Sequence, residues 1–148
     1  MKGRFFTLSV FFISLSLMAG CVSMDFNPAS DRLDKKAKAL MPARGKALVY
    51  VVRPGFIGKP FGRDVIVNGK KIGSNCGGYF VYFMARPGKH TIKTVGDNTA
   101  KLSINVRKGE ICFIEQIVSP GFLKGIMSLK KLNSTEGRKK LEECKLSS

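Results

Sequence analysis

The chain has 148 residues, one histidine, and 26 lysines and arginines against 10 aspartates and glutamates, a formal net charge of +16. This length is enough for one compact domain with a single hydrophobic core. So basic a protein is expected to attract polyanions, but the sequence has no RNP, zinc-finger or helix-turn-helix pattern, and we expect no nucleic-acid partner. A basic surface without a dedicated partner is the alternative.

Residues 1–21 have the pattern of an export signal. Lys2 and Arg4 form a positive start, an uncharged apolar run extends from Phe5 to Leu17, and small residues precede Cys21. The apolar run has 13 residues, whereas about 20 are needed to cross the hydrocarbon core of a bilayer. We therefore expect a signal peptide over residues 1–20 rather than a retained transmembrane anchor.

The end of this segment, Leu17-Met18-Ala19-Gly20-Cys21, resembles the lipobox of bacterial lipoproteins, with methionine where leucine is more common. The resemblance implies cleavage between Gly20 and Cys21, a diacylglyceryl group on the Cys21 thiol and a further amide-linked acyl chain. Two or three acyl chains anchor a protein stably. Val22 stands where an aspartate would retain such a protein in the inner membrane, which favours the outer membrane. Ordinary signal cleavage beside an incidental cysteine is the alternative.

Removal of residues 1–20 takes away two of the 26 basic residues, which leaves 24 against 10 acidic ones, a charge of +14. The polyanions available to an exported lipoprotein are anionic phospholipid, lipopolysaccharide and peptidoglycan. Three further cysteines, Cys76, Cys112 and Cys144, permit one disulfide in an oxidising periplasm, but no pairing is indicated. Their spacing matches no metal motif, so we expect no metal site.

Residues 21–45 are predicted to be the lipidated cysteine followed by a tether. This stretch contains Pro28, Pro42 and many charges but no sustained apolar pattern, with room for one short helical turn. The tether would lift a single folded domain, residues 46–148, off the bilayer.

The domain is predicted to be mainly β, a single antiparallel β-sandwich of seven or eight short strands. Apolar runs separated by turn residues predict strands over 46–53, 64–67, 70–73, 78–85, 90–95, 102–106, 111–118 and 126–132. Asn133 followed by Glu136 indicates a helix start, and residues 134–145 suit a short basic C-terminal helix.

Three of these strands, 47–52, 79–84 and 111–118, are apolar on both faces. In a sandwich one face meets the opposite sheet, so the other face needs a cover. The C-terminal helix is one candidate for that cover. An apolar surface left open for a partner is the alternative.

The blocks ALVYVVRP, VNGKKIG, GGYFVYFMARPGKHTI and GEICFIEQ, followed by PGF and EGRKKLEECKL, occur in this order along the chain. Together they resemble domain-of-unknown-function family 2846, a family of bacterial lipoprotein domains, over about residues 46–146. The segment from Gly78 to His90 is also similar to the PEGA-type β-sandwich modules of surface proteins. The resemblance implies an antiparallel β domain and brings no established catalytic residues.

The residues themselves do not indicate an enzyme either. His90 has no serine or cysteine nucleophile motif beside it. The acidic residues between positions 46 and 120 are Asp64, Asp97, Glu110 and Glu115, and their spacing proposes no pair of carboxylates facing each other across a cleft. We expect no catalytic residue, and no cofactor apart from the lipid on Cys21.

Two near copies of one motif follow two of the two-sided apolar strands: residues 53–59, RPGFIGK, and residues 119–125, SPGFLKG. If the two strands run parallel, both loops lie at one end of the domain. An apolar tip with a basic rim is then predicted from Arg53, Phe56, Ile57, Lys59, Phe61, Arg63, Phe122, Leu123 and Lys124. Such a tip suits an anionic amphiphile, a bilayer surface or an acidic protein.

The favoured alternative is that Phe56 and Phe122 fold back and plug the ends of the sandwich, because loop aromatics after short strands usually complete a core. The sequence thus predicts a non-catalytic outer-membrane lipoprotein whose domain faces the periplasm or the cell surface. It would act as a binding or scaffolding module, in contact with another envelope protein or with anionic glycan or lipid. The alternatives are an inhibitor or accessory subunit of an envelope enzyme, and a lipid or glycan carrier with an interior cavity. The oligomeric state does not follow from the sequence.

Overall fold

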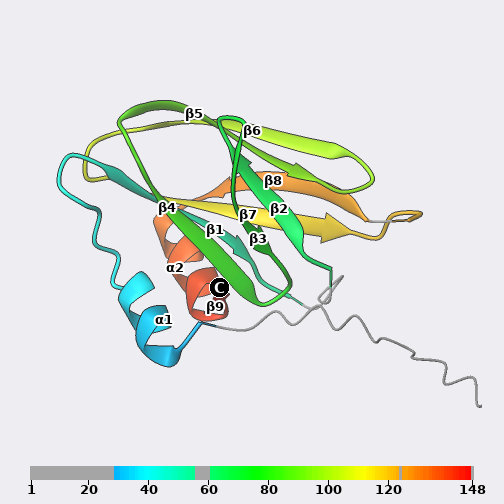
Figure 1. Ribbon diagram of the computed structural model, residues 1–148, viewed down its shortest axis with the longest axis horizontal. Coiled ribbons are helices and arrows are strands. Elements are labelled where there is room, and N and C mark those ends of the chain that lie inside the picture. Colours follow the sequence, from blue (N-terminus) through cyan, green and yellow to red (C-terminus); the bar gives the residue numbers. More distant parts are fainter. Residues whose placement is uncertain (1–28, 56–60, 124, 148) are drawn as a thin grey trace, which may run out of the picture.

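The computed structural model describes residues 29–55, 61–123 and 125–147. The elements in chain order are α1 (Asp31–Ala37), β1 (Ala47–Arg53), β2 (Arg63–Val67), β3 (Lys70–Asn75), β4 (Tyr79–Ala85), β5 (Gly88–Val95), β6 (Thr99–Val106), β7 (Ile111–Ser119), β8 (Ile126–Leu132), α2 (Ser134–Glu142) and β9 (Lys145–Leu146) (Figure 1). The protein is therefore mainly β, as predicted. No helix within the described ranges is long and apolar enough to cross a membrane.

The strands form two sheets that enclose the main core. One sheet has the order β8-β7-β1-β4-β9 and the other the order β3-β2-β5-β6. Val51 of β1 and Ile114 of β7 pack from the first sheet against Val65 of β2 and Ile92 of β5, and none of these side chains is exposed to solvent. Alternation along each strand sends its other side chains to the outer faces.

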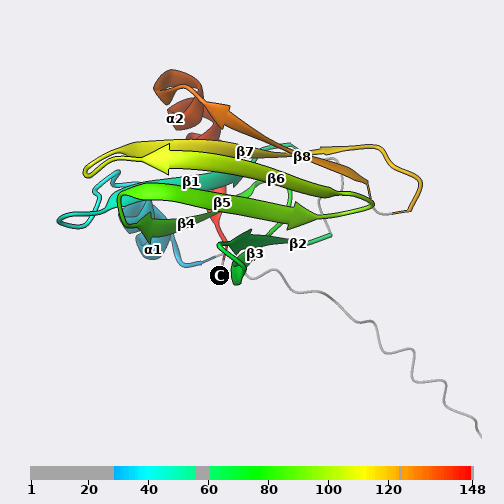
Figure 2. The ribbon, with the colours of Figure 1, turned by 90° about the horizontal axis from the view of Figure 1, so that it is seen from above.

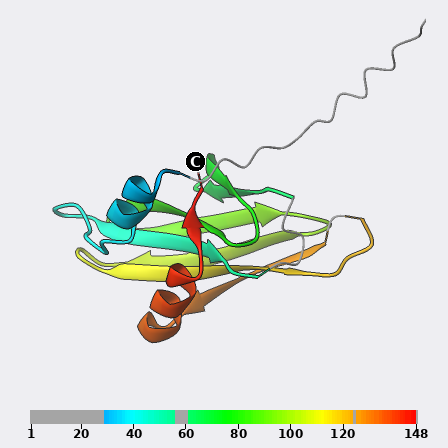
Figure 3. The same ribbon diagram turned by 90° about the horizontal axis from the view of Figure 1, so that it is seen from below.

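The outer face of the five-stranded sheet carries a second apolar layer beneath the two helices. Tyr50 of β1, Phe80 of β4 and Phe113 of β7 lie in this layer and contact Leu141 of α2 and Ala37 of α1. Figure 3, from below, shows both helices over this sheet. The C-terminal helix thus covers the face for which the sequence required a cover, and α1 shares that task.

Two local features place α2 on β7. The Asn133 side chain accepts a hydrogen bond from the backbone N–H of Glu136 at 2.9 Å, which caps the helix where the sequence predicted its start. Gly137 then lies directly on Phe113, where an added Cβ would come within 2.2 Å of the ring atom Cγ. Only glycine permits so close an approach. The helix ends at Glu142, three residues earlier than predicted.

The sheets are not purely antiparallel, and in this respect the predicted antiparallel sandwich is wrong. β1 pairs with β7 in parallel, with Val51 opposite Ile114, and β4 pairs in parallel with β9. A parallel pair needs a long crossover, and here the chain passes through the other sheet between β1 and β7. β9 was missed because two residues carry no periodic pattern, and it raises the number of strands in the described chain to nine.

The predicted tether is wrong over residues 29–45, because this segment is part of the folded body. The backbone N–H of Ala29 donates to the carbonyl of Leu146 at 3.2 Å, and the N–H of Leu146 donates to the Asp34 carboxylate at 2.7 Å. The Tyr50 hydroxyl donates to the carbonyl of Ala37 at 2.5 Å. A seven-residue helix with one buried alanine leaves almost no apolar pattern in the sequence.

Candidate binding tip

The structure tests only part of the predicted site. Gly20 and Cys21 lie outside the described residues, and so do Phe56, Ile57, Lys59 and Lys124. The described members are Arg53, Phe61, Arg63, Phe122 and Leu123.

The parallel pairing of β1 and β7 brings the C-terminal ends of both strands, where the two motifs follow, to the same end of the domain, but the two strands end at different heights. Val52 is level with Glu115, so Arg53 at the end of β1 is level with Gln116, whereas β7 continues to Ser119. Three residues of strand correspond to about 10 Å. The turn after β7 therefore projects beyond the end of β1, at the right-hand end of the long axis in Figure 1.

Phe122 and Leu123 stand in solvent on this turn. Their exposed fractions are 96% and 81%, so the prediction that Phe122 plugs the sandwich is wrong. Ile126, at the start of β8, is 50% exposed, and Val95, at the end of β5, is 42% exposed. We refer to Val95, Phe122, Leu123 and Ile126 as the distal tip.

A polar clasp from the β5–β6 turn holds the distal tip in place. The Asp97 carboxylate accepts hydrogen bonds from the backbone N–H groups of Leu123 at 3.2 Å and Gly125 at 2.9 Å. The Asn98 side chain accepts from the N–H of Met127 at 2.6 Å and donates to its carbonyl at 2.9 Å. The clasp joins the β5–β6 and β7–β8 turns into one unit. Figure 2 shows these two turns near each other at the right of the molecule.

Glycines at the clasp are required by close approach. A Cβ at Gly121 would lie 2.3 Å from an Asp97 carboxylate oxygen, and one at Gly96 would lie 2.5 Å from the carbonyl oxygen of Gly125. The sequence indicated only turns at these positions. Asp97 and Asn98 were not predicted as builders of the site, because a Gly-Asp-Asn turn does not reveal which distant loop it binds.

Arg53 was predicted to lie on the basic rim of the tip, but the structure shows that it is buried. Only 2% of it is exposed, and its guanidinium donates to the carbonyls of Phe61 at 2.9 Å and Asn75 at 2.8 Å. Burial, followed by the charge of Arg63, lowers its pKa to about 10, so it remains charged at neutral pH. Arg53 therefore fixes the end of β1 to the segment before β2 and to the end of β3.

Phe61 and Arg63 form a separate surface feature beside Arg53. Phe61 is 57% exposed, and the Arg63 guanidinium lies over its ring at 5.9 Å from the centroid. This pair lies at the level where β1 ends, below the projecting turn. The described residues of the predicted tip are thus divided between two levels.

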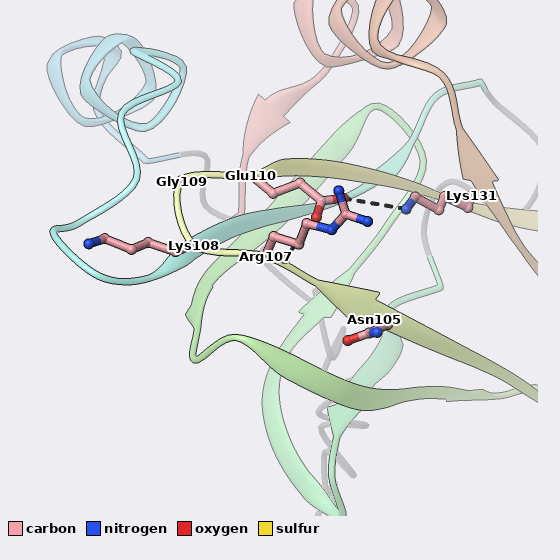
Figure 4. Close-up of a pocket in the computed structure, with 6 residues that line it drawn as sticks. All are labelled: Asn105, Arg107, Lys108, Gly109, Glu110 and Lys131. Atoms are coloured by element: carbon pink, nitrogen blue, oxygen red, sulfur yellow. Dashed lines mark hydrogen bonds and ion pairs between the residues drawn. The ribbon is translucent and has the colours of Figure 1, made fainter.

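An open hollow of about 490 Å³ lies at the opposite end of the domain, around the β6–β7 turn (Figure 4). Its lining residues are Asn105, Arg107, Lys108, Gly109, Glu110 and Lys131. The Glu110 carboxylate accepts from the N–H of Arg107 at 2.8 Å and lies 3.5 Å from the Lys131 ammonium, while Lys108 points away. The carboxylate offsets one of the three positive charges that line the hollow.

His90 has a structural position. Its Nε2 lies 2.7 Å from the carbonyl of Arg86, to which it donates, and its Nδ1 accepts from the Asn68 amide at 2.9 Å. The imidazole thus connects the β2–β3 and β4–β5 turns. Within the described ranges, no three histidine, cysteine or acidic side chains are grouped to hold a metal ion.

The three described cysteines, Cys76, Cys112 and Cys144, are buried thiols. Burial raises the pKa of Cys144 to about 12 and also raises the pKa of Cys112. Buried thiols of this kind are inert rather than nucleophilic.

The sequence model of the family described as "Protein of unknown function (DUF2846)" matches residues 43–127, which is more than half of the chain. The chain belongs to this family. The part matched by DUF2846 extends from the loop before β1 into β8 and contains the whole distal tip and its clasp, but neither helix. A relative from Haemophilus influenzae, described as an uncharacterized protein, is 27% identical over 147 residues, which cover 98% of this chain and 86% of that protein.

Proposed function

We propose that the protein is a non-catalytic outer-membrane lipoprotein whose β domain binds another protein of the cell envelope through the distal tip. Anchoring rests on the lipobox-like sequence that ends at Gly20-Cys21 and on Val22. The likeness of the segment from Gly78 to His90 to PEGA-type modules of surface proteins supports a place in the envelope. The observation that carries binding is the pair of large apolar side chains, Phe122 and Leu123, held in solvent by the Asp97–Asn98 clasp.

The chemistry of the distal tip favours an apolar pocket on a protein. Full burial of a phenylalanine or leucine side chain contributes about 1.5–3 kcal/mol each. The clasp fixes the backbone of the turn beforehand, so binding orders little more than two side chains. An aromatic anchor on a preorganised loop is typical of the residues that dominate protein interfaces.

An inhibitor or accessory subunit of an envelope enzyme is the second candidate, and one observation favours it. The turn projects about 10 Å beyond the end of β1, by the three residues that separate Ser119 from Gln116. A projecting apolar loop can enter a recess on a partner, whereas a flat scaffold surface cannot.

The test of tip binding is the double variant Phe122→Ser, Leu123→Ser, compared with the wild type in gently solubilised envelopes. We expect the wild-type chain to migrate in a complex larger than itself and the double variant to leave that complex without a change in melting temperature. The control is Lys101→Ser, since Lys101 is exposed on β6 and belongs to neither the distal tip nor its clasp. An unchanged complex in the double variant would contradict binding through the tip.

Anchoring is tested separately. We expect labelled fatty acid to enter the wild-type protein and to be absent from Cys21→Ser, and the labelled protein to fractionate with the outer membrane. Equal labelling of both proteins, or none in either, would contradict lipidation at Cys21.

A further inference from the structure

Because residues 29–45 are attached to the domain, only residues 22–28 lie between the predicted anchor at Cys21 and the first described contact. The first described hydrogen bond to the β domain is made by Ala29, to the carbonyl of Leu146. From Cys21 to Ala29 the chain advances by eight residues, with seven between them. Eight residues, even fully extended, span at most about 28 Å. A domain anchored at Cys21 is therefore held close to the membrane surface.

The side of the domain nearest this connection is α1, and its two faces differ. Ala37 and Asp34 face inward, since Ala37 is 5% exposed and Asp34 binds Leu146 and Lys38. Arg32, Lys35 and Lys36 are exposed on the other side of the helix, and Leu33, beside them, is 51% exposed. Figure 3 shows α1 in the outermost layer of the molecule.

The loop that connects α1 to β1 extends the same chemistry. Met41 is 74% exposed, and Arg44 and Lys46 are exposed as well. Two acidic residues lie within positions 31–46. Asp31 is exposed, whereas Asp34 is half-buried and its carboxylate lies 3.0 Å from the Lys38 ammonium, so the exposed charge of this stretch is mainly positive. Two exposed apolar side chains within an excess of cations match the chemistry of elements that lie in the interface of an anionic bilayer.

We propose that this anchor-side surface rests on the anionic head groups of the same membrane that holds Cys21. The surface consists of Arg32, Leu33, Lys35, Lys36, Met41, Arg44 and Lys46. The proposal rests on lipidation at Cys21, because the anchor makes the contact intramolecular and so raises the effective concentration of lipid around α1. Each lysine or arginine near an anionic surface favours the docked state about fivefold.

Docking through α1 leaves the distal tip accessible. Figure 1 shows α1 at the left of the long axis and the turn after β7 at the right-hand end. The lipid would thus orient the domain, and the tip would extend away from the docked helix toward a partner.

The experiment uses the full acylated protein in vesicles of phosphatidylethanolamine and phosphatidylglycerol, labelled with an environment-sensitive fluorophore through L33C. The buried native thiols leave the introduced thiol as the accessible one. S103C is the control position, since Ser103 is exposed on β6 of the other sheet. We expect a blue shift and protection from iodide quenching at position 33, and neither at position 103.

Two charge variants with the same net charge separate local docking from general attraction. The first variant changes Arg32, Lys35 and Lys36 to glutamine. The second variant changes Lys89, Lys101 and Lys108 to glutamine; these lysines are exposed on β5, on β6 and in the β6–β7 turn. Three cations at about fivefold each predict that the first variant lowers the ratio of docked to undocked protein on the order of 100-fold. We expect the second variant to keep the protection at position 33.

Failure of docking and failure of anchoring give different results. If an acylated, vesicle-bound protein shows position 33 as open to iodide as position 103, docking is wrong and lipidation stands. If intact mass shows no acyl group on Cys21, the proposed anchoring itself is wrong. Protection that survives about 1 M salt, where the screening length is about 3 Å, would contradict the role of the cations.

Discussion

Tyr50 connects α1 to the five-stranded sheet, and Tyr50→Phe is the sharpest single test of that connection. The side chain is fully buried, and its hydroxyl donates to the carbonyl of Ala37 at 2.5 Å. Phenylalanine keeps the ring, which stacks on Phe113 at a centroid distance of 5.4 Å. The variant therefore loses one hydrogen bond and leaves a buried acceptor without its donor, which lowers the free energy of unfolding by about 1–3 kcal/mol at neutral pH.

The same substitution changes the dependence of stability on alkaline pH. Burial raises the pKa of the Tyr50 phenol from its ordinary value near 10 to about 12, against a smaller lowering by a backbone hydrogen bond with Leu40. Between these values the unfolded chain releases the proton and the folded chain holds it, so stability falls as pH rises. Each pH unit costs about 1.4 kcal/mol, and the whole interval about 2.7 kcal/mol.

The wild type is thus the more stable protein at pH 7 and loses this advantage above pH 10, whereas Tyr50→Phe has no such loss. The two stability curves from urea unfolding should converge between about pH 10 and about pH 12, and they cross within this interval if the advantage of the wild type at pH 7 is below about 2.7 kcal/mol. Tyr82→Phe, on a ring that is 38% exposed, is the control for loss of a phenol at neutral pH. A difference between the wild type and Tyr50→Phe that stays constant from pH 7 to pH 12 would refute the burial of the hydroxyl.

Three further predictions concern α2, the clasp and the buried thiols. In Gly137→Ala the new Cβ would lie 2.2 Å from the Phe113 ring. Overpacking costs about 1–3 kcal/mol, which outweighs the gain of about 1 kcal/mol in helix propensity, so thermal unfolding should show a lower melting temperature. Thr135→Ala, at an exposed position of the same helix, is the control and should not lower it. Asp97→Ala removes the acceptor of two backbone N–H groups in the turn after β7. Hydrogen exchange should therefore accelerate in that turn while the sheets stay protected. Unchanged exchange in the turn would show that the Asp97 carboxylate does not hold it. Cys144 is buried and its pKa is raised to about 12, so an alkylating reagent should modify it at neutral pH only after denaturant is added, and rapid modification of the native protein would contradict its burial.

The strands could be predicted from the sequence because their information is local. The run from Ile111 to Val118 and the Asn68-Gly69 turn each contain their own pattern, and the structure places β7 over Ile111–Ser119 and β2–β3 around that turn. The excess of apolar residues on both faces of β1 also predicted a second covered layer, and the structure provides it beneath α1 and α2.

What the sequence could not provide depends on partners that are distant along the chain. Arg53 was expected on a rim because a charged residue usually stays in water; it is buried because Phe61 and Asn75 offer it carbonyls. Asp97 was one of four acidic residues without an evident pair, and its role follows only from the approach of the loop at Gly121. The sequence therefore predicted the apolar residues of the candidate site, Phe122 and Leu123, but not the Asp97–Asn98 clasp that holds them.

The measurement that tests the proposed binding role most directly is photo-crosslinking in intact cells from position 122, with position 103 on the outer face of β6 as the control. We predict a discrete protein adduct from position 122 that is absent from position 103. Adducts with lipid or glycan alone, no adduct at position 122, or the same adducts from both positions would contradict binding of a protein partner through the distal tip.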